Sequence, residues 1–194
     1  MERHKMLTVS VKLHTMMKKI ATWPAWVGSL ILVVAGYFIS TGTFIGADHV
    51  RAASGGTPML DTFFFYTPGR AYELLTAMGE AGRSAYLSAN LVDFFFPPCY
   101  TLFFVTSLAM IYTFIYEPED KRNWLVLVPF GAMLADYGEN ICVRLMLLVF
   151  PTVIMPAAQA ASLLTPLKFT LIVTAALLIM QGNMKVTNKL FAKK

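Results

Sequence analysis

The sequence is poor in cysteine, histidine and charge. Only two cysteines occur, Cys99 and Cys142, and each lies within a long apolar run. Two isolated cysteines argue against a disulfide framework and favour small buried side chains over a redox pair. The three histidines, His4, His14 and His49, lie outside the apolar runs. A zinc hydrolase with several histidine ligands is therefore not expected.

Charged residues make up only 14% of the chain, whereas 57% of its 194 residues are hydrophobic. Soluble domains rarely exceed about half apolar residues, so the composition predicts an integral membrane protein in contact with a lipid bilayer. The length allows one helical bundle and little else. The net charge is +5, but the basic residues gather at the ends of the chain rather than on a basic face with interleaved aromatics. A nucleic-acid partner is therefore not expected.

Four long apolar runs predict an all-α, integral membrane four-helix bundle that forms a single membrane domain, residues 1–194. Each run is long enough to cross roughly 30 Å of hydrocarbon. Trp23 and Trp26 stand at the start of the first run, where interfacial aromatic residues are expected. The predicted spans cover about residues 25–45, 87–115, 124–150 and 157–180.

The loop between the first two predicted spans contains turn residues, an aromatic stretch and a short helical pattern. The short helix is expected from Arg70 to about Met78, lying in the membrane interface over the bundle. Eleven Lys and Arg residues lie at the two termini and in the turn after the second span, but only three lie in the other two loops. The positive-inside rule therefore places both termini in the cytoplasm, or in the equivalent matrix or stroma.

The third run carries four polar side chains. Asp136, Asn140 and Arg144 recur at i, i+4 and i+8, which places them on one stripe of a helix. Glu139 lies beside Asn140 on the same side. An ionised group at bilayer depth costs about 2.5–3.5 kcal/mol even on a lenient insertion scale. These side chains are therefore expected to face other helices or a wet cavity.

The second and fourth runs offer partners for this stripe. Asn90, Asp93 and Tyr100 share one face of the second run, and a proline between the last two is expected to kink the helix. Lys168 lies near the middle of the fourth run. Estimated depths pair Lys168 with an acid of the third run, and Arg144 with Asp93. One negative charge is left over, as a protonated carboxyl, a cation site or the partner of a ligand amine.

This polar core favours the binding of a lipid-like or amphipathic small molecule. Acid–base chemistry is also possible on this arrangement, with Asp136 and Glu139 as the catalytic candidates. The oxygen ligands suit a hard cation such as Mg²⁺ or Ca²⁺, but no cofactor or metal ligand is assigned. The expected ligand-binding residues are Asn90, Asp93, Tyr100, Asp136, Glu139, Asn140, Arg144 and Lys168, and the expected cap of the site is Glu80, Arg83 and Tyr86.

Two other functions stay open on the sequence. The first is a structural or assembly subunit of a larger membrane complex, in which these charges pair with a neighbouring protein. Small residues of the third run, Gly131, Ala132, Ala135 and Gly138, allow close helix contact within the chain or with such a partner. The second is an ion or proton translocator, which would require a homo-oligomer because four spans are few for a transporter.

The polar residues also form an ordered pattern along the chain. Gly-x-x-Gly-Arg-x-x-Tyr is followed by an Asp with Pro and Tyr after it, then by Asp-x-x-Glu-Asn, then by a Lys in the last span. In this pattern the chain resembles a group of uncharacterised small four-span bacterial membrane proteins, over about residues 66–170. The resemblance implies a four-span fold and no particular activity. The matching positions are Gly79, Gly82, Arg83, Tyr86, Asp93, Pro97, Tyr100, Asp136, Glu139, Asn140 and Lys168.

Overall fold

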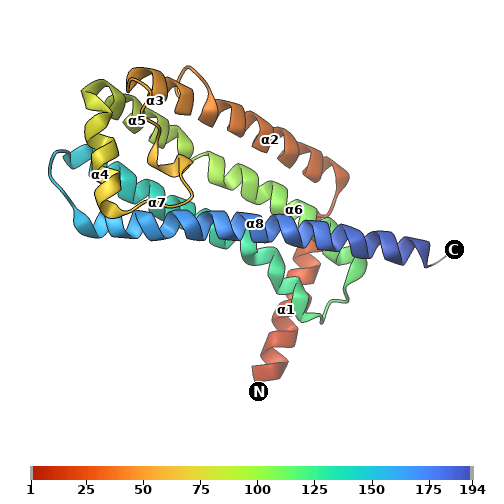
Figure 1. Cartoon of the computed structure of the whole chain (residues 1–194). Helices are drawn as coiled ribbons and strands as arrows, with labels where there is room; N and C mark the ends of the chain where they lie inside the picture. Colours follow the sequence, from red (N-terminus) through yellow and green to blue (C-terminus); the bar gives the residue numbers. More distant parts are fainter. Residues whose placement is uncertain (1, 193–194) are drawn as a thin grey trace.

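The computed structural model describes residues 2–192, and the side chains of residues 7–192. Over these residues every regular element is a helix, which confirms the predicted all-α class (Figure 1). The elements are α1 (Glu2–Ile20), α2 (Trp23–Thr41), α3 (Ala47–Ala53), the 3-10 helix η1 (Leu60–Thr62), α4 (Pro68–Ala77), α5 (Gly79–Asp93), α6 (Phe96–Ile115), the 3-10 helix η2 (Lys121–Leu127), α7 (Val128–Val149) and α8 (Met155–Phe191).

Three helical stretches among the described residues are long and apolar enough to cross a membrane. They are α2, the stretch Gly79–Ile115 that combines α5 and α6, and α8. These stretches contain most of the first predicted span and all of the second and fourth, and they support an integral membrane protein. The third predicted span corresponds to η2 followed by α7. α7 has 22 residues but carries three charged side chains, and it is not among the three apolar stretches.

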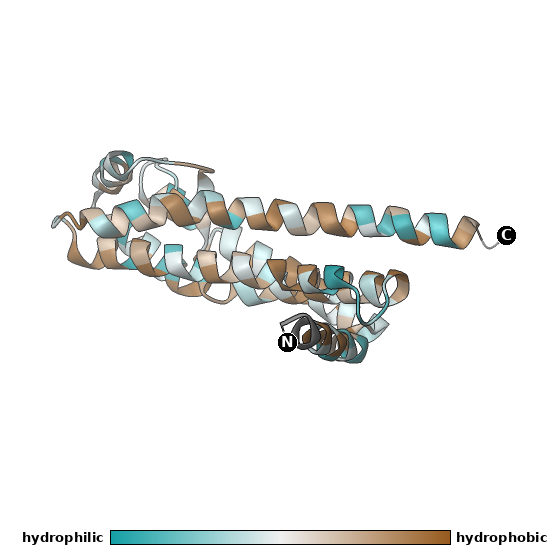
Figure 2. Ribbon diagram, turned by 90° about the horizontal axis from the view of Figure 1, so that it is seen from below, coloured by the Kyte–Doolittle hydropathy of each residue, from teal (hydrophilic) through white to brown (hydrophobic). Residues whose placement is uncertain are grey.

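Large apolar side chains stand exposed along the apolar helices. Ile31 and Phe38 of α2 are 62% and 68% exposed, and Leu163 of α8 is 69% exposed. In Figure 2 apolar colouring covers much of α8 and turns hydrophilic towards its C-terminal end. An apolar surface of this extent needs an apolar environment, and a bilayer supplies one.

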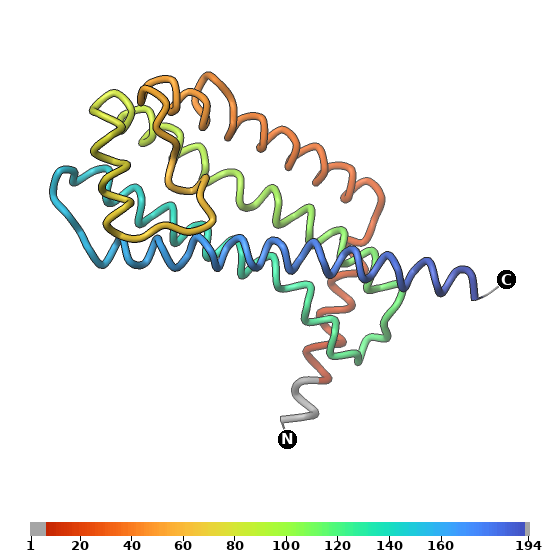
Figure 3. Tube along the Cα trace, in the orientation of Figure 1, coloured from red at the N-terminus to blue at the C-terminus, as the bar shows by residue number. Residues whose placement is uncertain are grey.

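The chain gathers distant segments at each end of the bundle (Figure 3). At one end, Ser10 of α1 donates a hydrogen bond to the carbonyl of Pro118 at 2.9 Å, in the turn after α6. Near the C-terminus of α8, Lys185 Nζ reaches the hydroxyl of Tyr116 at 3.0 Å. At the opposite end, the backbone N–H of Ile154, between α7 and α8, donates to the hydroxyl of Tyr72 in α4 at 2.7 Å.

Polar contacts and small residues bring the long helices together. Trp26 Nε1 of α2 donates to Ser107 Oγ of α6 at 2.9 Å, and the hydroxyls of Ser29 and Thr106 lie 2.9 Å apart. α7 packs along α8, and a Cβ built on Gly138 of α7 would lie 2.9 Å from Leu164 Cδ1 of α8. Part of the small-residue stripe of α7 is therefore used within the chain.

The second predicted span is broken next to Asp93, where the prolines predicted a kink. α5 ends at Asp93, and α6 begins at Phe96 with Pro97 and Pro98 in its first turn. Proline has no N–H to donate to the preceding turn, so the hydrogen-bond ladder of α5 cannot continue through this point. The break leaves Asp93 at a helix end, beside the loop that precedes α4.

The Gly-x-x-Gly pattern has a packing role at the start of α5. Gly79 adopts φ +64°, a left-handed conformation that suits glycine and separates α4 from α5. At Gly82 an added Cβ would lie 2.6 Å from Ser54 Cβ, next to the end of α3. The two glycines thus let the chain turn and then bring α5 close to α3.

Candidate functional site

The centre of the bundle holds an ion-pair triad between α7 and α8. Lys168 Nζ of α8 lies 2.5 Å from Glu139 Oε2 and 3.4 Å from Asp136 Oδ1. All three side chains are buried, and Glu139 is 0% exposed. Asp136 and Glu139 reach the same lysine because residues three apart on a helix share one face. The predicted pairing of Lys168 with acids of the third run is confirmed.

Hydroxyl and amide groups also form hydrogen bonds with the two acids. Thr165 Oγ1 of α8 donates to Glu139 Oε1 at 2.6 Å. The hydroxyl of Tyr100 donates to Asp136 Oδ2 at 3.0 Å, and Asn140 Nδ2 lies 3.4 Å from Asp136 Oδ1. Hydrogen-bonded and paired charges of this kind are the form in which buried charge is tolerated.

The network continues from this triad to neighbouring elements. Asn90 Nδ2 of α5 donates to the backbone carbonyl of Asn140 at 3.2 Å. The hydroxyl of Tyr66, from the loop before α4, lies 3.4 Å from Thr165 Oγ1. Burial raises the pKa of Tyr66 above its usual value, with the nearby carboxylate of Glu139 adding to the effect. The Tyr66 hydroxyl therefore stays protonated at physiological pH.

A second acidic pair lies beside the triad. Asp61, in η1, and Asp93, at the end of α5, lie close enough for their carboxyl groups to interact, and Ser40 of α2 lines the same cavity wall near Asp93. Burial and the proximity of Asp93 raise the pKa of Asp61 to about 7. Two carboxyl groups that share a hydrogen bond need one proton between them.

The loop that carries Asp61 is held in place by Tyr86 of α5. Its hydroxyl accepts a hydrogen bond from the backbone N–H of Leu60 at 3.1 Å, and Tyr86 is 1% exposed. Leu60 itself is fully buried among residues of α4 and α5. This anchoring fixes η1, and with it Asp61, against the polar core.

A cavity of about 200 Å³ lies where these elements meet. Its wall combines carboxyl groups, one ammonium group and aromatic rings, and its residues come from α2, α3, the loop that contains η1, α5, α6, α7 and α8. The lining residues are Tyr37, Ser40, Thr41, Ala47, Met59, Asp61, Thr62, Asp93, Phe96, Tyr100, Asp136, Lys168, Phe169 and Ile172.

Four of the expected ligand-binding residues, Asp93, Tyr100, Asp136 and Lys168, line this cavity. Glu139, Asn90 and Asn140 lie behind its wall and contact the lining residues or one another. Thus the structure gathers most of the expected residues into one connected network.

Arg144 does not pair with Asp93, so that expectation is wrong. Its Nη1 donates to the backbone carbonyl of Leu87 at 3.2 Å. Leu87 lies six residues before Asp93, about 9 Å along α5 at 1.5 Å per residue. Arg144 therefore contacts a different level of α5, while Asp93 turns towards the loop and α2.

The three expected cap residues separate into two places. Tyr86 anchors the loop that lines the cavity, as described above. Arg83 donates to the carbonyl of Leu75 at 2.9 Å and stands 4.0 Å from the centre of the Phe150 ring. With Glu80 it lines another hollow, near the turn between α7 and α8. Glu80 and Arg83 are thus not part of the cavity wall.

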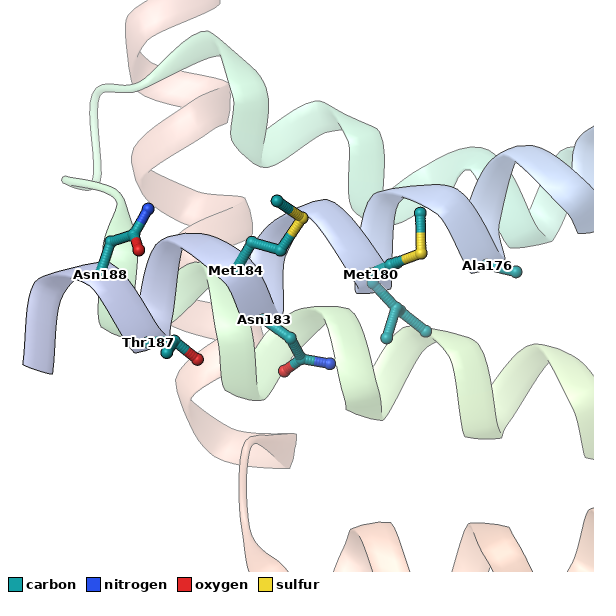
Figure 4. Close-up of a pocket in the computed structure, with 7 residues that line it drawn as sticks. Ala176, Met180, Asn183, Met184, Thr187 and Asn188 are labelled. Carbon is teal, nitrogen blue, oxygen red and sulfur yellow. The ribbon is translucent and has the colours of Figure 1, made fainter.

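A larger hollow of about 560 Å³ lies on the C-terminal half of α8, as Figure 4 shows. Every lining residue belongs to that one helix, and none is charged. The two methionines among them, Met180 and Met184, are 58% and 62% exposed. One helix face cannot enclose a ligand, so the charged cavity is the better candidate site.

Sequence reasoning missed residues that reach the site from the loop and from α8. Asp61 and Tyr66 flank an aromatic stretch that suggested only an interfacial loop, and Thr165 gave no signal beyond being a small polar residue. A lone acid inside the apolar stretch from Met59 to Tyr66 is the signal that points to Asp61, because such a carboxyl needs a polar partner.

Within the described residues, no three His, Cys, Asp or Glu side chains gather in a way that could hold a metal ion. No protein-family model, curated protein or solved structure matches the chain.

Proposed function

We propose that the chain crosses the membrane four times, through α2, α5–α6, α7 and α8. The evidence that α7 also crosses the membrane is that it has a buried polar face and an exposed apolar face. Asp136, Glu139 and Asn140 are buried in the bundle, whereas Leu134 and Ile141 are 66% and 58% exposed. A helix with polar groups inside and apolar groups outside can lie in lipid despite its ionisable residues. The resemblance to small four-span bacterial membrane proteins points the same way.

Both termini would then lie on the cytoplasmic side, with α4 at the outer interface. The contacts of α1 with the turn after α6, and of Lys185 with Tyr116, support a common side for the termini and that turn. After replacement of Cys99 and Cys142 by serine, single Glu119→Cys and Glu73→Cys variants test this orientation. An impermeant maleimide should label the Glu73 variant in intact cells, and the Glu119 variant only after permeabilisation. The reverse pattern would refute the orientation.

Within this bundle, the proposed function is the binding of a lipid-like or amphipathic small molecule. The observation that carries this proposal is the cavity, whose wall offers charge and aromatic surface together. Ligand sites are typically apolar concavities with a few placed polar groups, and drug-sized ligands need about 300–1,000 Å³. A cavity of about 200 Å³ suits a head group or a small molecule rather than a whole lipid.

The geometry favours binding over acid–base catalysis. Asp136 reaches the cavity, but its two oxygens already contact Tyr100, Asn140 and Lys168. Glu139 does not line the cavity and is bound by Thr165 and Lys168. The assembly alternative loses support as well, since Ala132 and Ala135 are buried within the chain.

Native mass spectrometry in a mild detergent tests this function. The purified parent should carry a bound mass of lipid or metabolite size, which Asp136→Asn should lose. Glu73→Gln is the matched control, because Glu73 is exposed on α4 and pairs with Arg70. A thermal melt confirms that each variant is folded. A clean unliganded parent, or a bound mass that Asp136→Asn retains, would contradict the proposal.

A further inference from the structure

The polar core is not neutral in the part of the chain that the structure describes. Four carboxyl groups, Asp61, Asp93, Asp136 and Glu139, surround a single cation, Lys168. The lysine is within 4.0 Å of the two acids of α7, and no ion pair joins either of the other two acids to a cation among the described side chains. Even with one proton shared between Asp61 and Asp93, that pair keeps one negative charge.

Asp61 also has an unused hydrogen-bond acceptor. Its Oδ1 atom is buried, and no donor of the described residues reaches it. A buried carboxylate oxygen without a donor is costly, and native proteins satisfy such atoms with protein groups, water or a ligand. Since Asp61 lines the cavity, a ligand there can supply the missing partner.

The rest of the wall has the chemistry that recognises an organic cation. Aromatic rings attract ammonium groups over their faces within about 6 Å. Lys168 Nζ already lies 5.1 Å from the centre of the Phe169 ring, so this wall stabilises positive charge. An anionic group would instead meet the carboxyls, and the lone lysine is engaged by two of them.

We propose that this cavity binds an ammonium group, held by the carboxyl pair of η1 and α5 and enclosed by aromatic rings. The inference rests on the proposed binding function and names its ligand class. The ammonium belongs either to the head group of an amphiphile or to a small free cation. The residues that recognise it are Asp61 and Asp93 for charge, and Tyr37, Phe96, Tyr100 and Phe169 for the rings.

Calorimetric titration of the full chain in a nonionic detergent tests the ligand class. Three probes share a twelve-carbon chain and differ in the head group: dodecyltrimethylammonium, dodecanol and dodecanoate. The ammonium probe should bind at least tenfold more tightly than the other two. Asp61→Asn and Asp93→Asn should each weaken it at least tenfold, and Glu73→Gln should leave it unchanged. Tyr37→Ala, at an exposed ring of the wall, should also weaken it and serves as the second variant where an aspartate variant does not fold.

Tetramethylammonium separates the two sources of the ammonium. Binding of this small cation as tightly as the long-chain probe identifies a free cation, and binding of the long-chain probe alone identifies a head group. Equal binding of dodecanol, or an ammonium affinity that neither the aspartate variants nor Tyr37→Ala weaken, overturns the inference. If dodecanol or dodecanoate binds and Asp136→Asn abolishes this binding, the proposed binding function stands and the ammonium preference is refuted. A parent that binds none of the probes and carries no co-purified mass would defeat both.

Discussion

Asp61 gives the sharpest prediction about stability, because its carboxyl is unusually hard to ionise in the folded chain. Burial and the neighbouring Asp93 raise its pKa from 3.8 to about 7. Between these values the folded chain holds a proton that the unfolded chain has released, so stability falls as pH rises through this window. A rise of this size corresponds to roughly 4 kcal/mol, present below the unfolded value and lost above pH 7.

Asparagine at this position keeps the shape of the protonated acid and never ionises. We therefore expect Asp61→Asn to match the parent near pH 4 and to be more stable at pH 8. With about 2–4 °C per kcal/mol for a chain of this length, the gain in melting temperature at pH 8 is roughly 10 °C. The charged and titratable groups that act on or respond to Asp61 are Asp93, Lys168, Asp136, Glu139, Tyr66 and Tyr86.

Thermal unfolding followed by tryptophan fluorescence, in one detergent from pH 4 to pH 8.5, measures this effect. Asp120→Asn is the control of opposite sign. Its side-chain hydrogen bonds with Arg122 lower the pKa of Asp120, so its stabilisation is present at neutral pH and is lost on acidification. That variant should melt below the parent at pH 7 and approach it towards low pH. An Asp61→Asn curve that parallels the parent at every pH would refute the reasoning.

Three further variants test the packing and the pairing. Lys168→Met removes the only cation of the α7–α8 triad and should lower the free energy of unfolding by about 3–5 kcal/mol. Adding Glu139→Gln should restore part of this loss. A melting temperature equal to the parent's would contradict the ion-pair triad. Tyr86→Phe leaves the buried N–H of Leu60 without its acceptor, so chemical denaturation should show a free energy of unfolding that is lower by about 1–3 kcal/mol. An unchanged value would mean that another acceptor replaces the tyrosine hydroxyl. Gly82→Ala would place a Cβ 2.6 Å from that of Ser54, and it should lower stability by about 1–3 kcal/mol in the same assay, unlike a neutral exchange at an exposed site.

The acids of α7 and their lysine could be predicted because their geometry is local. The positions of Asp136 and Glu139 follow from helical periodicity, and the depth of Lys168 follows from the rise per residue. A bilayer strengthens this logic, since a buried charge within it needs a partner. The structure joins these three side chains in one triad, as that reasoning expects.

The loop contribution could not be predicted in the same way. Asp61 enters the core because the neighbouring Leu60 is buried in the core cluster and its N–H donates to the hydroxyl of Tyr86, a contact that spans 26 residues of sequence. No periodicity describes a connection that folds back into a bundle. The pairing of Arg144 with Asp93 is wrong for a related reason. Depth along α7 indicates which helix Arg144 meets, but not that it contacts Leu87 rather than Asp93, the residue at which α5 ends.

α7 therefore organises the polar centre of the bundle. The three charged residues that set α7 apart from the apolar stretches also contact its neighbours: Asp136 and Glu139 pair with Lys168, and Arg144 bonds the carbonyl of Leu87. Where α7 meets α8, the acids are matched by a lysine, two hydroxyls and an amide. Where α5 meets the loop, two acids face each other without a cation in the described chain, and the cavity lies beside them. The ammonium ligand that we propose would supply the missing positive charge at this pair.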